Sequence, residues 1–187
     1  MKGSVVFRNV VRVLAAVAFS VVVLIAGCIG GMMLQYPVRA ATWHCIHGNE
    51  VMVGNRQLTL PLLWWRGKDI GSGSIVLRRG RIDSRLAFAT SELTLTKLKD
   101  VKAVTDADGI LGQNALLADL NRGRSKQTAF PLIVASPAGR IYCVKDLSIP
   151  NFSFLFCLPT GARWNFVFGP GTAKEESEAE SMLATLK

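Results

Sequence analysis

The chain has 187 residues, of which 50% are hydrophobic, and its formal net charge is +9. All of its acidic residues lie after residue 42, so the region from Trp43 onward has a net charge near +5. This region lacks the strongly basic surface typical of nucleic-acid-binding proteins, and we therefore expect no nucleic-acid partner.

The first long feature is an apolar segment near the N-terminus, where residues 13–34 include no charged side chain. As a helix it would be ~33 Å long, close to the ~30 Å hydrocarbon core of a bilayer. Tyr36 suits the headgroup zone, and Pro37 is expected to end the helix. The sequence therefore predicts a transmembrane signal-anchor helix over residues 13–36 and a short linker over residues 37–42.

The charges beside this segment predict its orientation. Lys2, Arg8 and Arg12 lie in the N-terminal residues 1–12, whereas only Arg39 follows the segment closely. Positive charge favours the cytoplasmic side, so we expect a single-pass protein of the bacterial inner (plasma) membrane with a cytoplasmic N-terminus. Residues 43–187 would then form an extracytoplasmic, periplasmic domain.

Two alternatives also export the domain. Residues 24–28, Leu-Ile-Ala-Gly-Cys, resemble a bacterial lipobox in which Cys28 would be lipidated after cleavage. A secretory signal cut after Ala40 is the other, because Val38 and Ala40 fit the small-residue rule. The length of the apolar run favours the uncleaved anchor, since the apolar core of a signal peptide is typically ~7–15 residues.

Three further cysteines lie in the exported domain, where disulfides can persist. Cys143 and Cys157 are the best pair, because they lie symmetrically about Pro150 in a predicted hairpin. Cys45 would then keep its thiol; alternatively, all three are small buried hydrophobic residues. No CxxC motif predicts a thioredoxin-type redox site.

The first half of residues 43–187 reads as short strands followed by one helix. A strand is predicted over residues 43–53, with a turn at Gly54-Asn55, and a looser one over residues 57–63. A hairpin over residues 74–77 and 82–89 would turn at Arg79-Gly80. Apolar residues at helical spacing predict a helix over residues 113–120.

The second half predicts four antiparallel strands in meander order, over residues 130–135, 140–147, 152–158 and 163–168. Aromatic residues recur with period two in the last two strands: Phe152, Phe154 and Phe156, then Trp164, Phe166 and Phe168. Each row points to one face of its strand and needs a cover.

A C-terminal amphipathic helix is predicted to supply that cover. Thr172 and Glu175 fit a capping box, and Ala179, Met182 and Leu183 belong to one apolar stripe. The fold class is therefore α+β: an N-terminal transmembrane helix, then one domain whose mostly antiparallel sheet is covered by a C-terminal helix.

The last two strands, the Gly169-Pro170 break and the closing helix resemble the end of the PsbP/DcrB-like group of small exported α+β domains. The resemblance covers about a quarter of the chain and transfers no residue. Members of the group include lipoproteins and photosystem assembly factors, most of them without enzymatic activity. The resemblance therefore implies a non-enzymatic role.

The densest cluster of chemically active side chains surrounds Cys45 and His47. On a strand these two residues would share a face, where they could form half of a metal site or a nucleophile with its base. They carry the alternative hypothesis of a small envelope hydrolase or thiol-dependent enzyme. Common motifs for nucleophilic, metal, nucleotide and dinucleotide sites are absent, so no cofactor or metal is predicted.

Two other features have mainly structural interpretations. Residues 106–111 resemble a calcium loop in composition but lack its key oxygens, so they predict a turn into a helix. The basic cluster of Arg78, Arg79, Arg81 and Arg85 is interpreted as a solvated hairpin tip, with lipid headgroups or an acidic partner as the alternative.

Trp64 and Trp65 are the candidate interaction surface, since adjacent strand residues point to opposite faces and one of the two should be partly exposed. The favoured function is a non-enzymatic binding or assembly module that acts on an envelope protein partner. A third hypothesis assigns the function to the membrane helix itself, through Gly27, Gly30 and Gly31.

Overall fold

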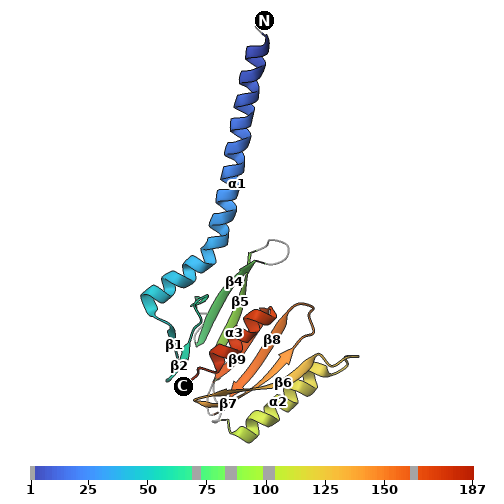
Figure 1. Ribbon diagram of the computed structural model, residues 1–187. Coiled ribbons are helices and arrows are strands. Elements are labelled where there is room, and N and C mark those ends of the chain that lie inside the picture. Colours follow the sequence, from blue (N-terminus) through green and yellow to red (C-terminus); the bar gives the residue numbers. More distant parts are fainter. Residues whose placement is uncertain (1–2, 69–72, 83–87, 99–103, 161–163) are drawn as a thin grey trace.

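The computed structural model describes residues 3–68, 73–82, 88–98, 104–160 and 164–187. A long helix leads into a domain with one large sheet, a small two-stranded sheet and two shorter helices (Figure 1). The helices are α1 (Gly3–His47), α2 (Asp106–Asn121) and α3 (Ala173–Leu183). The α+β class with a mostly antiparallel sheet and a C-terminal helix is confirmed.

The large sheet has seven strands in the order β3-β4-β5-β9-β8-β7-β6, and each neighbouring pair is antiparallel. β1 and β2 form a separate antiparallel hairpin that turns at Gly54-Asn55. The strands are β1 (Glu50–Val53), β2 (Arg56–Thr59), β3 (Trp64–Arg66), β4 (Ser74–Ile82), β5 (Phe88–Lys97), β6 (Ala129–Ser136), β7 (Gly139–Asp146), β8 (Ser153–Pro159) and β9 (Trp164–Gly171).

α3 covers one face of the sheet, as its apolar stripe predicts. Met182 and Leu183 pack with Leu155, Phe166 and Phe168 in the main core, where all five are buried. At about 1.5–3 kcal/mol for each large apolar side chain, this burial stabilises the docked helix strongly. Glu175 at the start of α3 accepts hydrogen bonds from the backbone N and Oγ1 of Thr172.

The aromatic rows of β8 and β9 lie on opposite faces, which corrects the prediction that α3 covers both. The register pairs Leu155 with Phe168 and Phe156 with Val167, so Leu155 and not Phe156 faces α3. Phe156 and Phe154 instead face the other side of the sheet and are only half-buried. Period two fixes which residues share a face of one strand, but the register between strands decides which rows coincide.

α1 continues through Pro37 to His47, so the predicted linker over residues 37–42 is helical. Of the strand predicted over residues 43–53, only the end forms a strand, β1. Figure 1 shows that α1 changes direction near Pro37, as expected where a proline removes a helical hydrogen bond. Beyond the bend the helix packs on the domain: Ala40 is buried, and the ring of Tyr36 stacks on Trp65 with a centroid distance of 5.9 Å. This packing stabilises a helix over residues 37–47, where the local sequence predicts none.

Arg79 and Gly80 lie inside β4, so the predicted hairpin turn at these residues is also wrong. A side chain at position 80 would overlap Tyr36, since an ideal Cβ there would lie 2.0 Å from the Cγ atom of Tyr36. Gly80 therefore allows α1 to approach β4. The glycine is needed for this close approach and does not form the turn that the sequence predicted.

α1 and α2 both lie on the sheet face opposite α3. Arg79 faces α3, so its neighbour Gly80, beneath α1, faces the other side. Tyr142 contacts Gly109 of α2, whereas the adjacent Cys143 belongs to the core beneath α3. The middle of this second face, on β5 and β9, lies between the strands that α1 and α2 contact.

Candidate binding groove

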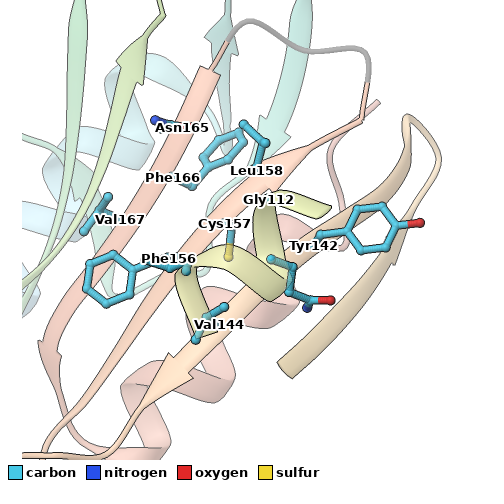
Figure 2. Close-up of a pocket in the computed structure, with 11 residues that line it drawn as sticks. Gly112, Tyr142, Val144, Phe156, Cys157, Leu158, Asn165, Phe166 and Val167 are labelled. Carbon is cyan, nitrogen blue, oxygen red and sulfur yellow. The ribbon is translucent and has the colours of Figure 1, made fainter. Parts of the chain in front are cut away.

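An apolar groove with a cavity volume of about 240 Å³ lies between α2 and the second face of the sheet (Figure 2). Its lining comes from one helix and three neighbouring strands: Gly112, Gln113 and Leu116 of α2; Tyr142 and Val144 of β7; Phe156, Cys157 and Leu158 of β8; Asn165, Phe166 and Val167 of β9. Most of these residues are apolar, as is typical of ligand and peptide pockets.

α2 is capped at its start and joined to the start of β6 at its end. At its start, Thr105 and Asp108 form a capping box, and the hydrogen bonds from Thr105 lower the pKa of Asp108. At its end, the side-chain oxygen of Asn121 accepts hydrogen bonds from the backbone N atoms of Thr128 and Ala129, each at 3.1 Å.

Gln113 fixes the middle of α2 to the sheet. Its side-chain nitrogen donates to the carbonyl oxygens of Leu132, at 2.9 Å, and Cys143, at 2.6 Å. These bonds satisfy two strand carbonyls beneath the helix, so the amide of Gln113 is engaged by the protein backbone. Tyr142 packs closely beneath Gly109, where a larger residue would overlap its ring.

The floor of the groove continues along β8 as an aromatic row. The rings of Phe154 and Phe156 stack with a centroid distance of 6.5 Å, and Val167 beside Phe156 remains 38% exposed. Figure 2 shows Phe156 and Val167 side by side at one end of the labelled set. The surface can therefore bury an apolar group larger than the cavity alone.

Trp64 and Trp65 are both buried, at 0% and 8% exposure, so the predicted exposed interaction surface is wrong. Each tryptophan does lie on a different face, but both faces are covered there. Trp64 donates from Nε1 to Glu178 of α3 at 2.9 Å, and Trp65 lies beneath Tyr36 of α1. The prediction failed because α1 packs on the sheet at Tyr36 and covers the second tryptophan.

The basic cluster is also placed differently from the predicted solvated tip. Arg79 is buried and binds Glu178 through Nε and Nη2 and Glu175 through Nη1, while Ser91 donates to Glu175 at 2.9 Å. Arg78 pairs with Glu92 at 2.8 Å. The side chain of Arg81 and the whole of Arg85 lie outside the described residues.

Cys45 and His47 lie on α1 and do not form the converging pair that the enzyme hypothesis requires. Residues two apart on a helix are rotated by about 200°, so the two side chains point to different sides. His47 stacks on Trp43 with a centroid distance of 5.1 Å, and its Nδ1 lies 3.1 Å from the carbonyl oxygen of Trp43. Cys45 is exposed.

The structure joins Cys143 and Cys157 in a disulfide across β7 and β8, where the register places them directly opposite. Cys28 is exposed on the apolar part of α1. Within the described residues, no three His, Cys, Asp or Glu side chains come together as a metal-binding group.

No protein family, curated protein or solved structure matches the chain. The resemblance of the C-terminal strands and helix to PsbP/DcrB-like domains therefore stays a prediction.

The groove residues were not predicted from the sequence as a site. Leu116 was part of the predicted helix and Phe156 part of an aromatic row, but nothing local indicates that the two lie together. The groove residues could be recognised only by an excess of apolar residues at strand positions that face away from the main core. The strand register is needed to know which positions these are.

Proposed function

We propose that this chain is a single-pass, membrane-anchored binding protein of the bacterial cell envelope. In this proposal α1 spans the inner membrane with a cytoplasmic N-terminus, and the domain lies on the extracytoplasmic side. The groove beneath α2 then binds an apolar segment of an envelope protein. The role is non-enzymatic.

The long helix supports the membrane part of this proposal. α1 is long and apolar enough to cross a membrane, and apolar side chains along it, such as Leu14, Leu24 and Leu34, are exposed rather than packed against the domain. The basic residues at its start support a cytoplasmic N-terminus. The buried disulfide between Cys143 and Cys157 supports an oxidising compartment for the domain.

The groove is the single observation that carries the binding part. Its walls are apolar, its floor continues as the aromatic row of Phe154 and Phe156, and α2 is fixed above it by the hydrogen bonds of Gln113. An apolar hollow with fixed walls favours recognition of an apolar side chain or short segment.

Site-specific photocrosslinking in intact membranes tests the binding role. A photoreactive phenylalanine analogue at Val167 should capture one discrete partner protein. Leu116→Glu places a charge in the groove and should abolish the crosslink, because burying an unpaired carboxylate is costly. Ala115→Glu is the matched control, since Ala115 is exposed on the same helix, and it should leave the crosslink intact. Equal crosslinking in both variants would reject the groove as the binding site.

A further inference from the structure

Two loops at one edge of the sheet lie side by side: residues 122–128 between α2 and β6, and residues 147–152 between β7 and β8. The first is basic, with Arg122, Arg124 and Lys126 and no acidic residue. The second has no charge and exposes Leu147 by 43% and Ile149 by 47%. We call these the paired edge loops.

Hydrogen bonds fix the paired edge loops to each other. Asp146, at the end of β7, accepts from Arg124 at 2.9 Å and from the backbone N of Ser148 at 3.0 Å, and Leu147 donates to the carbonyl oxygen of Thr128 at 2.9 Å. Burial alone would raise the pKa of Asp146, but the bonds from Arg124 and Ser148 lower it. The carboxylate is therefore ionised near neutral pH, and the two loops form one unit.

The paired edge loops lie at the edge of the sheet beside which α1 bends. Because all neighbouring strands are antiparallel, the end of β4 at Ile82 lies at the same edge as the end of β7 at Asp146. Tyr36 of α1 packs on Gly80, two residues before Ile82. Figure 1 shows this edge running from the top of β4 and β5 toward the β7–β8 connection, on the side from which the N-terminal half of α1 extends.

We propose that the paired edge loops dock on an anionic bilayer surface, the one that α1 crosses in the proposed function on which this inference rests. Leu147 and Ile149 enter the interface while Arg122 and Lys126 contact lipid phosphates. Exposed apolar side chains next to cations are the usual composition of a peripheral membrane contact. Lys174, exposed at the start of α3, adds a cation near the same edge.

The neighbouring charges favour this contact. Arg122 pairs with Asp119 at 3.4 Å, but both side chains are largely exposed and the pair is weak. Two described acidic residues near the edge are engaged within the protein: Asp146 binds Arg124, and Glu176 binds Lys145 at 2.5 Å.

Because α1 already holds the domain at the membrane, a weak contact between the paired edge loops and the bilayer is sufficient for docking. A surface tethered through α1 is present at a high effective concentration, so the loops need little affinity of their own to remain bound. The edge slopes away from α1 in Figure 1, so docking requires α1 to tilt in the bilayer together with the domain that is packed on it. Docking then sets the height and direction in which the groove beneath α2 faces its partner.

Depth-dependent fluorescence quenching of the full chain in lipid nanodiscs tests the proposal. An environment-sensitive fluorophore is attached at Ile149→Cys in a Cys28→Ser, Cys45→Ser background. Nitroxide lipids with the spin label near the headgroup are the quencher. We expect strong quenching at position 149 in nanodiscs that contain phosphatidylglycerol and much less in pure phosphatidylcholine. The matched control, Pro137→Cys at the opposite edge, should show none.

Charge removal supplies a second readout. Arg122→Ala and Lys126→Ala should each reduce the ratio of docked to undocked domain about fivefold, since each cation near an anionic surface contributes comparably. Arg140→Ala, an exposed cation at the opposite edge, should change nothing.

A fluorophore on Cys28, in a Cys45→Ser background and with nitroxide lipids labelled deep in the acyl chain, separates this proposal from the membrane anchor. If Cys28 is quenched deep in the bilayer while position 149 behaves like position 137, the docking proposal is wrong and the anchor stands. Equal quenching at position 149 in both lipids also overturns it, because the contact would not need anionic lipid. If Cys28 is not quenched at all, the anchor itself is wrong.

Discussion

Arg79 lies in a buried cluster that joins four elements, β3, β4, β5 and α3. Its guanidinium on β4 binds two carboxylates of α3, and the same carboxylates accept from Ser91 on β5 and Trp64 on β3. The cluster is nearly dehydrated, since Arg79 is 7% exposed and Glu175 2%. Such a site tolerates the loss of one partner poorly, because the remaining charges stay buried without compensation.

Arg79→Leu should therefore destabilise the protein by about 3–5 kcal/mol, because the carboxylates of Glu175 and Glu178 lose their counter-charge. Urea unfolding of the purified chain, followed by tryptophan fluorescence, measures the change. In the triple variant Arg79→Leu, Glu175→Gln, Glu178→Gln, most of the lost stability should return. A triple variant no more stable than the single one would show that packing rather than charge explains the loss.

Glu180 on α3, unlike Glu175 and Glu178, lies in surroundings that disfavour its charged form. Burial and the neighbouring Glu176 raise the pKa of its carboxyl group, although Lys145 partly offsets them. A raised pKa in the folded state means that stability from this group is present at low pH and is lost as the pH rises through the raised pKa.

Glu180→Gln should therefore raise the thermal unfolding midpoint slightly at neutral pH, since it removes an ion that the fold disfavours and that solvent partly screens. The advantage should shrink as the pH falls and vanish below about pH 4, where the glutamate is protonated in both states. Thermal scans of both proteins across this range give the comparison. A constant advantage at every pH would contradict the electrostatic explanation.

At the scale of elements, α1 has two parts with different surroundings. Its apolar part projects from the domain, while the part around Pro37 packs on β3 and β4 through Tyr36, just before the proline, and Ala40, just after it. The close approach of Tyr36 depends on the missing side chain of Gly80.

Gly80→Val should separate this part of α1 from the sheet, because the new side chain would occupy the space of the Tyr36 ring. Losing the burial of a large apolar side chain costs about 1.5–3 kcal/mol. If the Tyr36 ring loses its contacts, the population in which this part of α1 is detached from the sheet should increase roughly tenfold or more. Trypsin cleavage after Arg39, which is exposed on this part, reports the opening. Adding Tyr36→Ala should not accelerate cleavage further; additive effects would place the strain elsewhere.

Local patterns predicted the elements whose signals lie within one segment. The meander β6–β9, the capping box at Thr172 and the apolar stripe of α3 all depend on period and caps, and the structure contains them. Three of the errors, which concern the helix around Pro37, Gly80 and Trp65, meet at Tyr36, which contacts both Gly80 and Trp65. There, tertiary packing overrides the local preferences of proline and glycine.

The candidate groove was beyond sequence prediction for a related reason. Its walls come from α2, β7, β8 and β9, and only the register shows that Phe156 and Val144 share the face beneath Leu116. The disulfide partners could be predicted because the hairpin between them is local.

At the scale of the whole molecule, the packed part of α1 has a functional consequence. A domain joined to its anchor by a docked helix has a restricted orientation, unlike one on a flexible linker. In the proposed anchored arrangement, the groove beneath α2 and the paired edge loops would have defined positions relative to the bilayer. In this account, the anchor both retains the domain at the membrane and directs its binding surface.

The most direct test of the account is thiol labelling in intact spheroplasts with a membrane-impermeant maleimide. In a Cys28→Ser background, Cys45 at the exposed end of α1 should be labelled without lysis. A cysteine introduced at Ser4, in a Cys28→Ser, Cys45→Ser background, should be labelled only after lysis. The reverse pattern would place the domain in the cytoplasm and contradict the anchored, extracytoplasmic binding role.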